Sequence, residues 1–183
     1  MQTSSTGVSR TRQVVAAVIG NALEWYDFIV YGFLASIIAR QFFPSDDEYA
    51  SLLMALATFG VGFFMRPVGG VLLGMYSDRK GRKAAMQMII RLMTVSIAMI
   101  AFAPDYLAIG MAAPLLIVVA RMLQGFATGG EYASATAFLV ESAPAHRKGL
   151  YGSWQLVGQC LAVFSGAAMV ALVTHLCSPE ALD

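Results

Sequence analysis

Five long apolar runs decide what this chain can fold into. They occupy residues 14–40, 49–74, 84–103, 112–139 and 151–174. Each run is long enough to cross a hydrocarbon core of about 30 Å, where every backbone polar group must be bonded within the protein. The period-two alternation that marks membrane barrel strands is absent. The sequence therefore predicts an all-α fold, a polytopic transmembrane helix bundle of about five helices.

The composition supports a membrane location and excludes several classes of function. Hydrophobic residues make up 58% of the chain and charged residues 13%, against roughly 45–50% and 25% in soluble domains. A net charge of +1 argues against nucleic acid as a partner. Cys160 and Cys177 have no histidines at metal-ligand spacing and are interpreted as apolar fillers. We expect the lipid bilayer as a partner, no enzyme activity, no cofactor and no metal.

The distribution of lysine and arginine predicts the orientation, because cytoplasmic loops carry an excess of both. One set of loops and the amino-terminal segment contain Arg10, Arg12, Arg79, Lys80, Arg82, Lys83, Arg147 and Lys148. The opposite loops contain Arg40 with Asp46, Asp47, Glu48, Asp105, Glu180 and Asp183. We therefore expect a cytoplasmic amino terminus, with residues 1–13 as a disordered cytoplasmic tail.

Six charged residues fall within the apolar runs, and each would cost roughly 2.5–3.5 kcal/mol near the centre of a membrane helix. They are Glu24, Asp27, Arg66, Arg91, Arg121 and Glu131. Such residues must be paired, protonated, near the interface or beside water. Arg91 is expected to snorkel to the interface or to form a local pair. Arg66 precedes Pro67, and a structural role there is favoured at least as much as a functional one.

The spacing of the polar residues places them on single helix faces. Asn21, Glu24, Asp27 and Tyr31 are three or four residues apart, as are Arg121, Gln124, Thr128 and Glu131, and likewise Gln155 and Gln159. Three polar stripes predict a shared hydrophilic cavity. The alternative is hydrogen bonding that only joins helices, and both interpretations stay open for the two glutamines. Two GxxxG pairs, Gly70 with Gly74 and Gly125 with Gly129, predict close helix packing.

The segment from Gly74 to Lys83, GMYSDRKGRK, is the most specific feature of the chain. Its two glycines favour a tight reversal between the second and third helices. Asp78 is suited to cap a helix start and to accept hydrogen bonds from arginine, while four cations hold the loop at the cytoplasmic face.

This segment resembles the signature of the major facilitator superfamily between helices two and three, matched at Gly74, Asp78, Arg79, Gly81, Arg82 and Lys83. RMLQG at 121–125 and ESAPAHR at 141–147 resemble two further signatures. Other segments resemble the metabolite:proton symporter family, which carries citrate, 2-oxoglutarate, shikimate, proline or betaine. They are GNALEWYDF at 20–28, FFMRP at 63–67, GGEY at 129–132 and YGSWQ at 151–155.

The resemblance implies a secondary transporter of the inner membrane that carries a small carboxylate or zwitterionic metabolite with protons by alternating access. It implies that proton and substrate are handled by Glu24, Asp27, Arg121, Gln124 and Glu131. A cytoplasmic gating loop would comprise Gly74, Asp78, Arg79, Gly81, Arg82, Lys83, Glu141 and Arg147, in which Asp78, Arg82 and Glu141 form a charge cluster. Secondary candidates are Asn21, Tyr31, Arg66, Gln155 and Gln159.

A complete carrier of this family has twelve helices in two halves. We therefore expect residues 14–183 to be a partial amino-terminal transporter domain whose partner is the missing carboxy-terminal half. The alternative is a membrane remnant or subunit that inserts but does not transport alone.

Overall fold

The computed structural model describes residues 10–141 and 143–176, without the side chains at 10–13, 16, 17, 82, 83, 133–138 and 141. Its helices are α1 (Arg10–Phe33), α2 (Ala35–Phe42), α3 (Glu48–Lys80), α4 (Arg82–Ala101), α5 (Tyr106–Ile109), α6 (Ala112–Glu141), the 3-10 turn η1 (Ala145–Arg147) and α7 (Lys148–Leu176). Four helices are long and apolar enough to cross a membrane, or five if the bent pair α1–α2 is one span. The predicted all-α bundle is confirmed.

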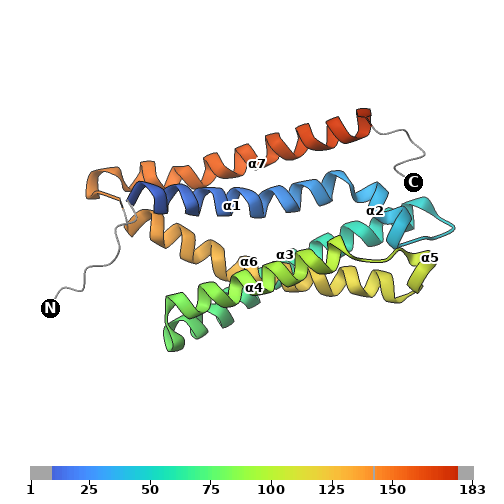
Figure 1. Cartoon of the computed structure of the whole chain (residues 1–183), viewed down its shortest axis with the longest axis horizontal. Helices are drawn as coiled ribbons and strands as arrows, with labels where there is room; N and C mark the ends of the chain where they lie inside the picture. The colour runs from blue at the N-terminus through green and yellow to red at the C-terminus, as the bar shows by residue number, and fades with distance from the viewer. Residues whose placement is uncertain (1–9, 142, 177–183) are drawn as a thin grey trace.

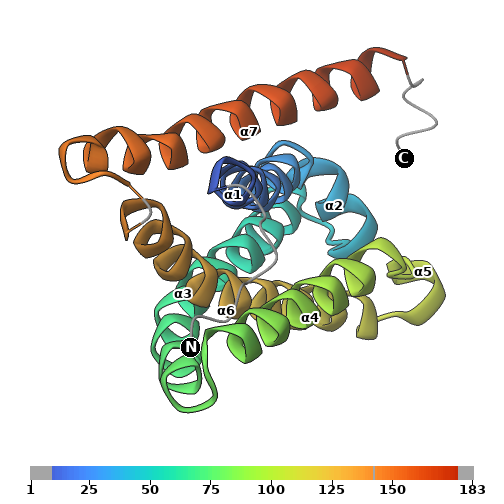
Figure 2. The ribbon, with the colours of Figure 1, turned by 60° about the vertical axis from the view of Figure 1, so that its left-hand side comes forward.

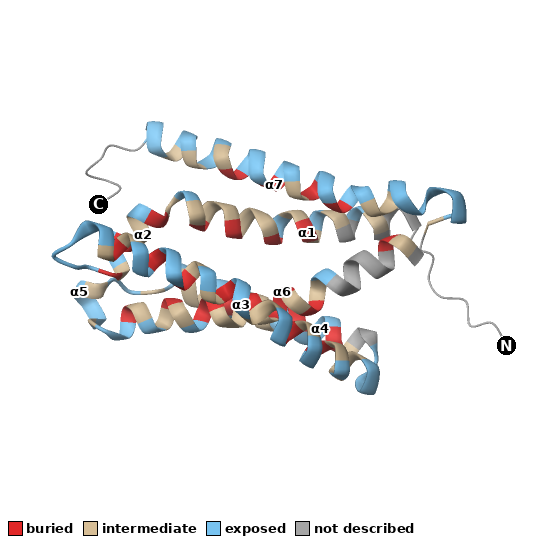
Figure 3. Cartoon of the chain, turned by 180° about the vertical axis from the view of Figure 1, so that it is seen from behind, coloured by how far each residue is buried: buried red, intermediate tan, exposed pale blue. Residues whose placement is uncertain are grey.

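The long helices form two neighbouring groups. Helix α7 lies along α1, while α3, α4 and α6 pack together beneath them (Figures 1 and 2). Buried residues face the contacts between helices, and the outward surfaces are exposed (Figure 3). Many exposed side chains are large and apolar, including Leu53, Phe64, Leu161 and Phe164. An apolar exterior of this extent suits contact with lipid.

The single helix predicted over 14–40 is two helices in the structure. The chain bends by 67° at Leu34, where φ is −91° and ψ is 11°. Beyond the bend, α2 packs on the start of α3, and the Ser51 hydroxyl donates to the carbonyls of Ala39 and Phe43. The contact partner lies on another helix, so the local sequence carried no signal for the bend.

The predicted reversal between Gly74 and Lys83 is shorter than expected. Helix α3 continues through Gly74 and Asp78 to Lys80, and Gly81 alone turns the chain. Gly81 has a φ of 88° and a ψ of 152°, which favours glycine because no Cβ is present. Asp78 therefore lies in the final turns of α3 and does not cap the next helix, which is a correction. No residue between Gly74 and Lys80 interrupts a helix.

Glycines bring the backbones of α3 and α6 into direct contact. A Cβ on Gly69 would lie 1.9 Å from the Phe126 carbonyl oxygen, and one on Gly125 would lie 1.9 Å from that of Gly62. A Cβ on Gly129 would lie 2.0 Å from the Arg66 oxygen. Close packing at Gly125 and Gly129 is thus confirmed. Gly125 packs on Gly62, and Gly129 packs on Arg66 and on Gly70, whose nitrogen a Cβ on Gly129 would meet at 2.9 Å. Of the predicted pair Gly70 and Gly74, only Gly70 makes such a contact, because a Cβ on Gly74 would meet nothing within 4 Å.

We expect Gly69→Ala to destabilise the bundle by about 1–3 kcal/mol, because the added methyl group would meet rigid backbone. Gly60→Ala is the matched control on the same helix, where a Cβ would meet nothing within 4 Å. Thermal unfolding of the purified variants in detergent measures the difference. Equal unfolding temperatures would show that the contact between α3 and α6 is looser than described.

Candidate functional site

A buried polar cluster joins α1 to α6. Arg121 Nη1 donates to Asp27 Oδ2 at 3.0 Å, and Gln124 hydrogen-bonds to both of these side chains. The Arg121 side chain is 2% exposed, whereas that of Asp27 is 33% exposed. The structure thus brings together three of the five residues assigned to proton and substrate handling.

Aromatic rings complete the surroundings of Arg121. Its Cζ atom lies 3.9 Å from the centre of the Tyr31 ring, which stacks on Phe59 at 5.8 Å. The Tyr31 hydroxyl donates to the Ala55 carbonyl at 3.3 Å. A guanidinium over an aromatic face gains cation–π attraction, which is stronger in a site shielded from water. Arg121 is therefore held by a carboxylate, an amide and a ring.

The other two assigned residues, Glu24 on α1 and Glu131 on α6, belong to a separate group of charged residues. Glu24 is 4% exposed and interacts electrostatically with Glu131 and Arg66. The Thr128 hydroxyl lies close to Glu24, but neither carboxylate oxygen has a hydrogen-bond partner of good geometry in the described part of the chain. Two acids and one arginine from three helices therefore share one region of the interior.

An open cavity of about 460 Å³ adjoins this group. Its lining comes from α1, α3, α6 and α7, and comprises Trp25, Arg66, Pro67, Gly70, Thr128, Gly129, Tyr132 and Gln159. Of the residues in the three predicted polar stripes, only Thr128 and Gln159 line this cavity, and Arg66 is the charged residue in its wall. A cavity shared by all three stripes stays a prediction. The sequence interpretation gave no role to Trp25 or Tyr132. Their positions directly after Glu24 and Glu131 were the available signal.

The two glutamines of α7 have different surroundings. The Asn21 amide donates to the Gln155 backbone carbonyl at 3.2 Å, which ties α1 to α7. Gln159 lies one turn further and reaches the cavity wall. The contact at Gln155 thus fits a joining role, and the position of Gln159 fits the cavity. Arg91 is exposed on α4 and makes no hydrogen bond or ion pair with described residues, so the expected local pair is not seen there.

The residues assigned to the gating loop belong to the α3–α4 turn and the α6–α7 turn, which lie at the same end of the bundle but apart from one another (Figure 1). Asp78, Arg79 and Arg147 are exposed there. The side chains of Arg82, Lys83 and Glu141 lie outside the described residues. The charge cluster of Asp78, Arg82 and Glu141 therefore stays a prediction.

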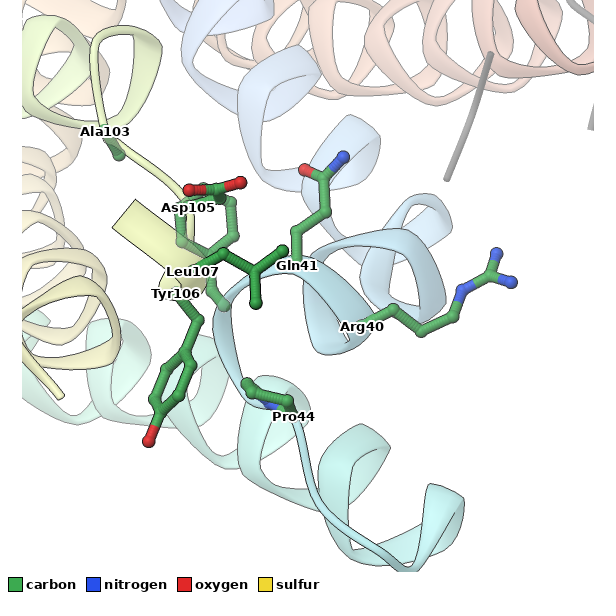
Figure 4. Close-up of a pocket in the computed structure, with 8 residues that line it drawn as sticks. Arg40, Gln41, Pro44, Ala103, Asp105, Tyr106 and Leu107 are labelled. Carbon is green, nitrogen blue, oxygen red and sulfur yellow. The ribbon is translucent and has the colours of Figure 1, made fainter. Parts of the chain in front are cut away.

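A second cavity of about 450 Å³ lies at the opposite end, between the α2–α3 and α4–α5 connections. Its lining includes Arg40, Gln41, Asp105 and Tyr106. Figure 4 shows that the side chain of Arg40 extends away from that of Asp105, the other charged residue of this lining. Because its charged groups diverge, this cavity is the weaker candidate for a substrate site. In the described part of the chain, no three His, Cys, Asp or Glu side chains are grouped as metal ligands would be.

Comparison with known proteins identifies the family. Residues 13–180 match the family described as sugar (and other) transporter. A citrate-proton symporter of Klebsiella pneumoniae is 39% identical over 98% of this chain and 40% of its own length. A proline/betaine transporter of Salmonella typhimurium is 40% identical over 92% of this chain and 34% of its own. A shikimate transporter of Escherichia coli is 38% identical over 94% and 40%.

The chain thus spans between 34% and 40% of the length of these three relatives. No solved structure matches it significantly. The resemblance to metabolite carriers drawn from the sequence is confirmed, and these relatives are transporters rather than enzymes. The chain belongs to the sugar (and other) transporter family of the major facilitator superfamily.

Proposed function

We propose that this domain serves a secondary transporter in which a small organic acid or zwitterionic metabolite moves together with protons. The observation that carries the proposal is the cluster of Asp27, Arg121 and Gln124. A titratable carboxylate there pairs with a fully buried guanidinium, while one third of the carboxylate side chain stays exposed. Charged residues inside a membrane bundle mark transport pathways more often than structural contacts.

The cluster couples proton binding to helix packing. When Asp27 is ionised, its ion pair with Arg121 holds α1 against α6. Protonation removes the negative charge and weakens that attraction, so the two helices separate at lower cost. Alternating access requires interior surfaces of this kind to open and close around a site near the membrane midplane. Asp27 would therefore act as a proton-dependent latch between α1 and α6.

The relatives support the substrate class, and the distribution of basic residues supports the orientation. Their names refer to citrate with protons, proline or betaine, and shikimate, all small polar metabolites. We propose the bacterial inner membrane as the location, with the amino terminus in the cytoplasm. The start of α1, the α3–α4 turn and the α6–α7 turn lie at one end of the bundle, and that end carries most of the basic residues (Figure 1).

A second function is a membrane subunit that inserts without transporting by itself. The share of the relatives' length that the chain spans favours testing it. The two functions differ in one measurable respect, which is accumulation of substrate against a gradient.

The proposed transport is tested by the uptake of radiolabelled citrate, shikimate and glycine betaine into membrane vesicles. The chain is produced in two forms. One form is the chain alone, and the other is the chain fused to the remaining carboxy-terminal part of the Klebsiella pneumoniae symporter. We expect accumulation that a protonophore abolishes. Asp27→Asn should lower it by about tenfold or more, because the neutral amide cannot form the proton-dependent ion pair with Arg121. Arg91→Gln, on an exposed face of α4, should leave it unchanged.

Each other outcome of this experiment has a definite meaning. Accumulation that survives the protonophore would refute proton coupling. Full activity of Asp27→Asn would refute the role of the latch. If both forms of the protein insert but neither accumulates any of the three compounds, the non-transporting subunit is the better description.

The proposed orientation is tested by labelling intact cells with a membrane-impermeant maleimide. In a background with Cys160→Ser and Cys177→Ser, we expect Asp46→Cys to be labelled from outside. Lys80→Cys should be labelled only after the cells are permeabilised. Both positions are exposed and lie at opposite ends of the bundle. The reverse pattern of labelling would place the amino terminus outside the cytoplasm.

A further inference from the structure

Three buried N–H donors around the central cavity have no acceptor among the described residues. They are Nε and Nη2 of Arg66 and the indole Nε1 of Trp25. Both residues line the cavity of about 460 Å³. More than 90% of buried polar groups in proteins have a hydrogen-bond partner, so three such donors beside one cavity require an explanation. The common need of all three is an acceptor.

We propose that Arg66, assisted by Trp25, binds the carboxylate of the transported metabolite, and that Glu24 is the counter-charge whose protonation accompanies this binding. The inference rests on the transport function proposed above. It also gives the two interior arginines different roles, helix contact for Arg121 and ligand binding for Arg66. Arg121 is already engaged by Asp27 and Gln124, whereas Arg66 forms no ion pair with a described residue.

Aromatic rings restrict the directions from which a ligand can approach the Arg66 guanidinium. Its Cζ atom lies 4.2 Å from the centre of the Phe63 ring, 4.4 Å from that of Phe28 and 5.1 Å from that of Trp25. Rings over the planar face of a guanidinium leave its N–H groups at the edge, which match a carboxylate in the same plane. The rings also exclude water, which strengthens a charge-assisted hydrogen bond.

The backbone fixes the position of this arginine. The Arg66 carbonyl oxygen lies where a Cβ on Gly129 would clash at 2.0 Å, so Arg66 stands at one of the three closest points of the α3–α6 contact. Gly70 and Gly129 contribute cavity wall without side chains. A volume of about 460 Å³ falls within the range of roughly 300–1,000 Å³ that is common for small-molecule sites.

The charges that face Glu24 explain why a proton would bind together with the carboxylate. Arg66 faces it from α3, Glu131 and Tyr132 belong to the same group on α6, and α7 contributes only the uncharged Gln159. With both glutamates ionised, Glu24 stands beside one negative and one positive charge, those of Glu131 and Arg66. A substrate carboxylate would add a further negative charge, and proton uptake by Glu24 offsets it. By linkage, the proton and the carboxylate each favour the binding of the other.

The test uses the fluorescence of Trp25 in a Trp154→Phe background, which leaves one tryptophan in the chain. The purified protein is titrated with citrate, shikimate and glycine betaine, and with choline, which resembles glycine betaine without the carboxylate. We expect at least one carboxylate to change the fluorescence and choline to have no effect. Arg66→Gln should weaken binding by about tenfold or more, since it removes the charge-assisted hydrogen bonds to the carboxylate. Arg66→Lys should retain part of the affinity, and Arg91→Gln all of it.

The same titration at several pH values tests the role of Glu24. We expect tighter carboxylate binding as the pH falls, and we expect Glu24→Gln to bind with little dependence on pH. Circular dichroism and thermal unfolding identify any variant that fails to fold, and Arg66→Lys then serves in place of Arg66→Gln.

Three results would overturn the inference: no response to any of the three carboxylates, unchanged affinity in the folded Arg66 variants, or an unchanged pH dependence in Glu24→Gln. Failure of the proposed function is distinguishable. Arg66-dependent binding without uptake that is sensitive to a protonophore would leave the carboxylate site standing and refute symport. Such uptake without dependence on Arg66 would do the opposite.

Discussion

The backbone contact between α3 and α6 is the constraint on which the interior depends. Gly125 and Gly129 on α6 meet the Gly62 and Arg66 carbonyls of α3 at distances that exclude even a methyl group. In lipid, apolar side chains gain little by associating, so close packing of small residues is a principal source of helix association. The same contact sets the positions of two arginines, since Arg66 and Arg121 both lie on the helices that it joins.

The two arginines meet the cost of burial in different ways. Arg121 receives a carboxylate and an amide from within the protein, and its guanidinium covers the Tyr31 ring. Among the described residues, Arg66 contacts aromatic rings and interacts electrostatically with Glu24 and Tyr132, without an ion pair. An internal partner suits a contact that holds helices together. The lack of such a partner suits a group that takes its acceptor from a passing ligand.

Periodicity alone located much of this site. The spacing of Glu24 and Asp27, and of Arg121 and Gln124, placed them on helix faces that do turn inward. The pairing of Asp27 with Arg121 was beyond that reasoning, because it depends on how α1 is rotated against α6. The bend at Leu34 and the glycine partners of α6 have the same origin, since each is decided by a residue on another helix. By contrast, membrane helices follow from length and composition, which are local properties.

Arg66 has surroundings that its place in the sequence does not reveal. Its place before Pro67 predicts a structural role at least as much as a functional one, and that choice stays open. In the folded chain its neighbours include Trp25 and Phe28 from α1, and Gly129 from α6. These three contacts come from segments about forty residues before it and sixty after it. A cavity wall assembled in this way joins helices that must move for transport, so ligand binding at Arg66 would act on the packing of α1, α3 and α6 together.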